Sequence, residues 1–163
     1  MKKCCAVILL LLLLTGCGAQ ETFETISDEY VQSASAVQMD ILLNVPQEAV
    51  MQSLKNEDGE KIYLCDGYTL TVQTMEAGDL DATIQTICGY SRDSLTVMET
   101  APGDYKRYDF VWSCAGEGGD QVGRAAILDD GSHHYAVSCM APEENSGALR
   151  DTWDAIFNSF WLG

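Results

Sequence analysis

Alternating apolar and polar positions predict β-strands along most of the chain. The clearest pattern lies on either side of Asp66-Gly67, where residues 61–65 and 68–74 alternate around a dipeptide that favours a tight hairpin turn. A second turn signal, Asp129-Asp130-Gly131, separates the last two predicted strands. The further predicted strands cover residues 38–46, 50–54, 95–100, 105–114, 122–128 and 133–140.

Two segments carry the apolar spacing of an amphipathic helix. In the first, Asp79 is a candidate N-cap and Gly89 a candidate end, and the apolar positions between them recur every three or four residues. In the second, Ser146 can cap a helix that runs to Phe160. We therefore expect an α+β domain, in which an antiparallel sheet of about five to seven strands with a C-terminal meander packs against a mid-chain helix and a C-terminal helix.

The glycine-rich residues 115–120 predict a flexible hairpin loop between two strands. Glu117 and Asp120 could offer oxygen atoms to calcium, but the segment lacks the regular spacing of known calcium loops. It also lacks the Gly-Lys-Ser/Thr sequence of a phosphate loop. No cofactor is expected.

The first residues have the pattern of an export signal. Lys2 and Lys3 precede an apolar run that ends at Leu14. This run is too short to span a bilayer as a stable helix, which needs about 20 residues. The chain is therefore expected to act outside the cytoplasm.

The residues that follow, Leu14-Thr15-Gly16-Cys17, resemble the lipobox of bacterial lipoproteins. The resemblance implies that Cys17 is acylated and that the chain is cut after Gly16. Two or three acyl chains on one cysteine would hold the protein stably on the bacterial cell membrane. An ordinary signal peptide cut a few residues later, or an uncleaved anchor, would also export the domain.

This interpretation divides the chain into three parts. Residues 1–16 are the signal peptide, residues 17–26 are the lipidated N-terminus with a short tether, and residues 27–163 form a single α+β domain.

Charge excludes one class of partner. The 163 residues contain 25 Asp and Glu against 9 Lys and Arg, for a formal net charge of −16. Recognition of phosphate backbones needs a basic face, so we expect no nucleic-acid partner. The same charge would keep the domain soluble and away from anionic lipid.

Four cysteines remain in the predicted domain: Cys65, Cys88, Cys114 and Cys139. An even number in an exported chain permits two disulfides. Each cysteine also lies in an apolar-patterned segment, where a free thiol behaves as a small buried hydrophobe. Both interpretations stay open at this point.

The candidate metal ligands are few. Asp129 and Asp130 precede His133, which makes a weak surface site for a divalent cation conceivable. His133 and His134 are adjacent on a predicted strand, so their side chains should point to opposite faces. The alternative is an ordinary polar start to a hairpin strand. Among the three tryptophans, Trp112 and Trp153 are expected in the core and Trp161 on the surface.

The end of the chain resembles a known group of proteins. A meander, a short Ala141-Pro142-Glu143-Glu144 loop and a helix ending Ile156-Phe157-Asn158-Ser159-Phe160 are similar to the end of DcrB and PsbP-like proteins. The resemblance implies helices packed on an antiparallel sheet and a role in binding or assembly, without a catalytic motif.

The sequence thus predicts a membrane-anchored envelope lipoprotein, more plausibly a binding protein than an enzyme. Its expected partners are the lipid membrane, through acylated Cys17, and an unknown protein or small ligand at the outer face. No catalytic residue stands out, and the alternative is a hydrolase of envelope material that uses acidic residues.

Overall fold

The computed structural model describes residues 37–52, 60–116 and 118–163. The predicted signal peptide, Cys17, the tether, residues 27–36 and Glu117 lie outside these ranges. The described elements, in chain order, are β1 (Ile41–Leu42), β2 (Val50–Gln52), β3 (Lys61–Cys65), β4 (Tyr68–Glu76), α2 (Leu80–Cys88), η2 (Arg92–Ser94), β5 (Met98–Thr100), β6 (Lys106–Gly116), β7 (Gly119–Asp129), β8 (His133–Pro142), η3 (Glu143–Asn145), α3 (Ser146–Asn158) and β9 (Trp161–Leu162).

Within the described residues, seven strands form one antiparallel sheet in the order β2-β3-β4-β8-β7-β6-β5. The hairpin predicted at Asp66-Gly67 is confirmed: Cys65 pairs with Tyr68, and Gly67 adopts φ 77°, a conformation that favours glycine. The meander β6-β7-β8 follows the predicted order. The α+β class is therefore as the sequence predicts.

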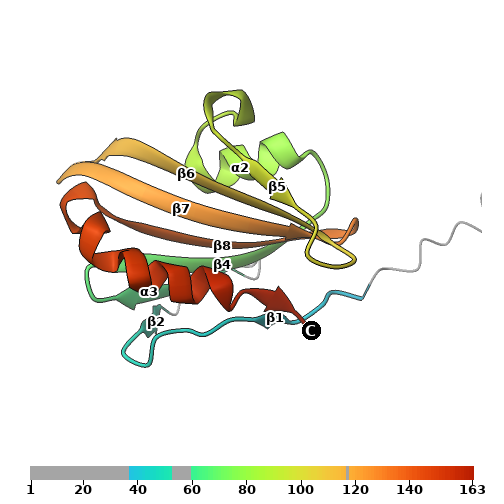
Figure 1. The fold of residues 1–163 in the computed structure, drawn as a ribbon, viewed down its shortest axis with the longest axis horizontal. Helices are drawn as coiled ribbons and strands as arrows, with labels where there is room; N and C mark the ends of the chain where they lie inside the picture. The colour runs from blue at the N-terminus through green and yellow to red at the C-terminus, as the bar shows by residue number, and fades with distance from the viewer. Residues whose placement is uncertain (1–36, 53–59, 117) are drawn as a thin grey trace, which may run out of the picture. The chain divides into compact units, whose positions relative to one another are not determined.

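The two helices cover opposite faces of this sheet (Figure 1). Strand β7 has buried residues at four successive positions, of which Ala125 and Ile127 face α2, while Ala126 and Leu128 face α3. Alternation of side chains along a strand places these two sets in separate cores. On the α2 side, Ile84 packs against aromatic residues of β6: Tyr108, Phe110 and Trp112.

Helix α2 begins and ends as its sequence predicts. The Asp79 side chain accepts a hydrogen bond from the Asp81 N–H at 3.0 Å, which satisfies one free donor of the first turn. Gly89 ends the helix in the left-handed conformation, at φ 79°. A buried polar contact also ties the helix to the sheet, because Thr83 Oγ1 lies 2.7 Å from His134 Nδ1 on β8.

Helix α3 differs from its predicted limits at both ends. Asn145, not Ser146, is the N-cap residue, and the Ser146 hydroxyl donates to the Glu143 carbonyl of η3. The helix ends at Asn158, although Phe160 is still buried in the core. Arg107 of β6 donates to the carbonyls of Phe157 and Phe160, which gives these free acceptors a partner.

The first and last described segments pair with each other, which the sequence analysis did not predict. Ile41 pairs with Leu162 and Leu42 with Trp161, so β1 and β9 form a separate two-stranded ribbon. Asp40 and Gly163 exchange two further backbone hydrogen bonds, of 3.0 and 3.1 Å. The strand predicted over residues 38–46 is therefore too long. Only Ile41 and Leu42 form a strand, because β9 offers only two residues for pairing.

The glycine-rich residues 115–120 do connect two strands as a hairpin, but the predicted loop is too long. Strand β6 continues to Gly116 and β7 starts at Gly119, with these two glycines paired. Further along β7, Gly123 pairs with Trp112, and the indole lies across the glycine. A Cβ atom at position 123 would overlap the six-membered ring of Trp112.

Gly123→Ala is therefore expected to destabilise the domain by about 1–3 kcal/mol, as overpacking does in well-packed cores. The measurement is urea unfolding followed by tryptophan fluorescence. Gly147→Ala is the matched control, because a Cβ at that α3 position meets no atom within 4 Å. We expect that control to be neutral or up to about 1 kcal/mol more stable. Equal losses in both variants would contradict the packing argument.

Candidate functional site

The carboxylate oxygens of Asp129 and Asp130, two of the predicted metal ligands, accept hydrogen bonds within the β7-β8 turn. Asp130 Oδ1 accepts from the backbone N–H groups of Ser132 and His133, at 2.8 and 2.7 Å. Its Oδ2 accepts from the Tyr135 hydroxyl at 2.9 Å. Asp129 Oδ1 accepts from the Gly131 N–H at 2.8 Å. These carboxylates therefore hold the turn in shape.

The two histidines do point to opposite faces. His134 is buried against α2, and its Nε2 lies 3.8 Å from Asp129 Oδ2. His133 is half-buried, with Nδ1 3.9 Å from Asp130 Oδ2. In the described ranges, no three His, Cys, Asp or Glu side chains come together as a metal site. The turn is a structural feature, and its residues are not brought together around a cation.

The hydrogen bonds to Asp130 set its ionisation. Burial alone would raise the pKa of this carboxyl group, but the donors from Ser132, His133 and Tyr135 outweigh burial and hold the pKa below its usual value. The Tyr135 hydroxyl also accepts from the Met39 N–H at 2.9 Å. Asp130 thus stabilises both the turn and, through Tyr135, the segment that precedes β1.

The structure has all four domain cysteines as free thiols. Cys65 and Cys139 pack in the α3-side core, whereas Cys88 and Cys114 pack in the α2-side core. Burial raises the pKa of Cys139 to about 12 and also raises that of Cys65. These two thiols are therefore protonated at neutral pH and are poor nucleophiles.

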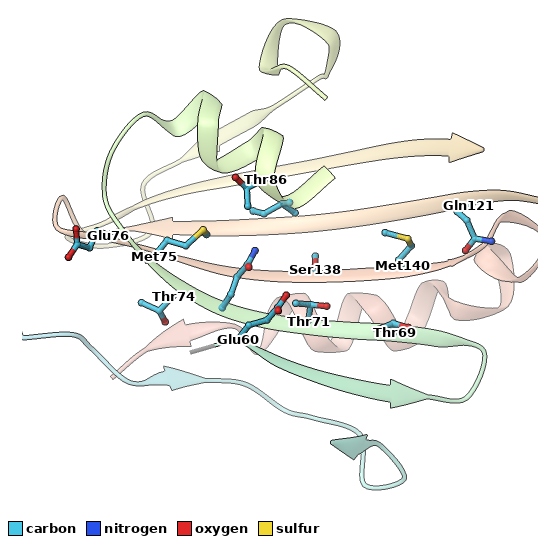
Figure 2. A pocket seen from close by; sticks show the side chains of 12 residues that line it. Glu60, Thr69, Thr71, Thr74, Met75, Glu76, Thr86, Gln121, Ser138 and Met140 are labelled. Atoms are coloured by element: carbon cyan, nitrogen blue, oxygen red, sulfur yellow. The ribbon is translucent and has the colours of Figure 1, made fainter. Parts of the chain in front are cut away.

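A groove on the α2 side of the sheet has a volume of about 770 Å³. Figure 2 shows that its floor is formed by β4 and β8, while α2 forms one wall. We call it the sheet groove. Its lining residues are Glu60, Thr69, Thr71, Gln73, Thr74, Met75, Glu76, Thr86, Ile87, Gln121, Ser138 and Met140.

The strand register explains the polar floor. Thr71 pairs with Ser138, and Thr69 pairs with Met140, so their side chains lie side by side across β4 and β8. Glu76 and Gln121 lie at opposite ends of the sheet groove (Figure 2). The groove exists because α2 packs over β6 and β7 and leaves this part of the same sheet face uncovered.

The lining determines which chemistry is available. Threonine, serine and glutamine side chains supply both donors and acceptors, while Met75, Ile87 and Met140 supply adaptable apolar contacts. Among the described lining residues, the only charged side chains are Glu60 and Glu76, and none is a histidine, cysteine, lysine or arginine. The sheet groove therefore suits a polar ligand that is neutral or positively charged.

Sequence reasoning missed this site. Thr69, Thr71 and Gln73 occupy alternate positions of a correctly predicted strand, where polar residues are normally solvent-facing. Their alternate spacing indicated that the three side chains share one face of the strand. It did not indicate that a helix would pack beside that face. The tryptophans were placed correctly: Trp112 and Trp153 are buried and Trp161 is exposed.

Comparison with solved structures identifies the fold. The chain is similar to cyanobacterial PsbP (CyanoP) from Synechocystis sp. PCC 6803, with a TM-score of 0.58 and 11% identity over 76% of this chain and 86% of that one. It is also similar to the Saccharomyces cerevisiae Ran-binding protein Mog1p, with a TM-score of 0.50 and 12% identity over 77% and 96%. LpqN, involved in cell envelope biogenesis of Mycobacterium tuberculosis, matches with a TM-score of 0.49 and 12% identity over 77% and 84%.

The similarity to CyanoP shows a PsbP-like fold, as the C-terminal resemblance implies. No protein-family model and no curated protein sequence matches the chain. In the part of the chain that the structure describes, no helix is long and apolar enough to cross a bilayer.

The turn at Asp130 gives a pH-dependent prediction. Because the folded-state pKa is lowered, the ionised carboxylate stabilises the fold above its unfolded pKa of about 3.9, and this contribution is lost as pH falls through the folded value. Asp130→Asn is expected to lower the free energy of unfolding at pH 7 by about 1–3 kcal/mol.

The difference from the unmodified protein should narrow below about pH 4. The measurement is urea unfolding across pH. Asp151→Asn, on an exposed position of α3, is the control for removal of a carboxylate. A difference between Asp130→Asn and the unmodified protein that stays constant from neutral to acid pH would count against this role.

Proposed function

We propose that this protein is a non-catalytic, lipid-anchored binding protein of the bacterial cell envelope, and that the sheet groove takes a small polar ligand that is neutral or positively charged. The observation that carries the proposal is the half-covered sheet face, which leaves about 770 Å³ lined by hydroxyl and amide groups. Such a recess has the size typical of small-molecule sites.

The composition of the sheet groove supports binding over catalysis. Nucleophilic catalysis needs a base within hydrogen-bond reach of the nucleophile, usually a histidine. The described lining contains hydroxyl groups and no histidine. A hydrolase that relies on acidic residues would have to use Glu60 and Glu76, which are the groove's two carboxylates.

The ligand's charge follows from the same residues. The Glu76 carboxylate repels anions, and the net charge of the chain is −16. A phosphate or carboxylate ligand would lack the Lys or Arg partner that such groups normally require. Neutral sugars, neutral peptides and basic peptides remain compatible with the lining.

Envelope location rests on the sequence. The Leu14-Thr15-Gly16-Cys17 motif supports acylation of Cys17 and anchoring at the outer face of the membrane. The groove and the anchor are independent parts of the proposal, so each has its own test.

Filling the sheet groove should abolish ligand binding. In a thermal-shift screen of sugars, neutral peptides and basic peptides, a ligand at 100 times its dissociation constant adds about 2.7 kcal/mol, which raises the melting temperature by about 5–10 °C. We expect Thr71→Trp to lose this shift, because a bulky ring would occupy the groove floor. Thr100→Trp, on an exposed position of β5, should retain it.

Two outcomes would contradict the binding proposal. One is a set of hits limited to anionic ligands, such as sugar phosphates and acidic peptides, when these are added to the same screen. The other is turnover of an envelope substrate that is lost in Glu60→Gln or Glu76→Gln, which would favour the hydrolase instead. Retention of turnover in both variants would contradict the hydrolase.

The anchor gives a separate prediction. Cys17→Ser removes the thiol that would carry the lipid, so the protein should move from the membrane fraction to the soluble fraction and should lose incorporation of labelled fatty acid. Cys4→Ser, inside the predicted signal peptide, is the matched control and should still be labelled. Labelling that survives in Cys17→Ser would contradict the assignment.

A further inference from the structure

The β1-β9 ribbon has one buried and one exposed side. Ile41 and Leu162 pair with each other and pack against the α3-side core. The other pair, Leu42 and Trp161, faces outward, with 49% and 46% of each residue exposed. Large apolar side chains at neighbouring positions on an exposed ribbon require a separate explanation, because core packing does not account for them.

Trp161 is held in place despite its exposure. Its ring meets Tyr105 edge-on, with the ring centroids 5.6 Å apart and the planes at 86°. Tyr105 itself packs partly against the α3-side core. The Leu42 side chain lies beside Gly163, where an added Cβ atom would be only 2.7 Å from Leu42 Cδ1. The ribbon therefore presents an ordered apolar surface, and an ordered surface loses little conformational entropy when it binds.

The predicted lipid anchor precedes this surface in the chain. Val37 is the first described residue and is 88% exposed, and β1 starts four residues later. Cys17 lies twenty positions before Val37 in the chain. A segment of that length spans at most about 70 Å. A lipid on Cys17 would therefore keep the ribbon within about 70 Å of the bilayer.

We propose that Leu42 and Trp161 form a membrane-docking surface that inserts into the headgroup region of the anchoring bilayer. Tryptophan and tyrosine are the side chains that favour this region, because they combine an apolar ring with a polar hydrogen-bonding group. The proposal rests on the acylation of Cys17, which supplies the high local concentration of lipid that a small apolar surface needs.

The charges around the surface select the lipid. Asp40 is exposed beside β1, and Asp104 precedes Tyr105. Among the cations, Lys61 lines the recess next to Asp40 and Leu42, Lys106 pairs with Glu99 at 3.4 Å, and Arg107 pairs with Asp109. Although one cation lies beside Leu42, the net charge is −16, so docking is driven by apolar burial and favours zwitterionic over anionic bilayers.

Fluorescence can test this contact because the other two tryptophans are buried. Trp112 and Trp153 are 5% and 6% exposed, so lipid-borne quenchers should reach Trp161 selectively. The full chain is expressed in a bacterium, its N-terminal mass is measured, and the purified protein is reconstituted into phosphatidylcholine vesicles. Some vesicles carry bromine on the acyl chains near the headgroup, and others carry it near the chain ends.

We expect quenching by the shallow bromine to exceed quenching by the deep bromine, together with a blue shift of the emission. Trp161→Phe should lose both effects. Replacing part of the lipid with phosphatidylglycerol should weaken both. The matched control is Trp161→Phe combined with Leu64→Trp, which moves the indole to an exposed position on the opposite face of the sheet and should show no quenching.

The outcomes separate the docking surface from the anchor. An acylated protein whose Trp161 is not quenched overturns the docking surface and leaves the anchor intact. Equal quenching of the Leu64→Trp control also overturns it, because contact would then be nonspecific. A protein without lipid on Cys17 overturns the anchor and the docking surface together. Groove binding is measured separately and is unaffected by any of these results.

Discussion

Burial of both faces of β7 is the constraint on which the rest of this structure depends. From Ala125 to Leu128, successive side chains enter opposite cores, so each face of the sheet must be covered. Helix α3 and the β1-β9 ribbon cover one face, and α2 packs on the other (Figure 1). Neither helix can be lost without exposing a row of apolar residues, which is why a layered arrangement is stable for this sequence.

The sheet groove exists because α2 covers only part of its face of the sheet, whereas α3 and the β1-β9 ribbon together cover the other face. Helix α2 has nine residues, and its buried Ile84 packs over β6 and β7. On the same sheet face, β4 and β8 carry Thr69, Thr71 and Ser138, whose hydroxyl groups tolerate water. The change from apolar to hydroxyl-bearing residues across the sheet therefore matches the edge of the helix. The Thr83–His134 contact fixes that edge, because it ties α2 to β8 beside the recess.

The local signals in the sequence were reliable where one interaction determines the structure. Asp79, Gly89 and the Asp66-Gly67 pair each act on their immediate neighbours, and all three lie where the sequence predicts. The pairing of β1 with β9 was missed because its partners are far apart in the chain. The extension of β6 and β7 through Gly116 and Gly119 and the role of Asp130 in holding Tyr135 involve nearby residues, but they depend on hydrogen bonds that apolar periodicity cannot show. Periodicity could not show the sheet groove either, since it arises from the placement of α2 over a strand face that looked ordinary.

Pairing between β1 and β9 also imposes an order on assembly. Ile41 meets Leu162, so this contact closes a loop that contains nearly the entire domain. Local hairpins such as β3-β4 and β6-β7 can form while synthesis is still under way, but the ribbon must wait for the final residues. Closing so long a loop is entropically costly until the rest of the sheet has already brought its ends together. Strand β1 therefore docks last among the described strands. The core of the sheet forms first, and the N-terminal segment that would lead to the lipid anchor is fixed on the domain only afterwards.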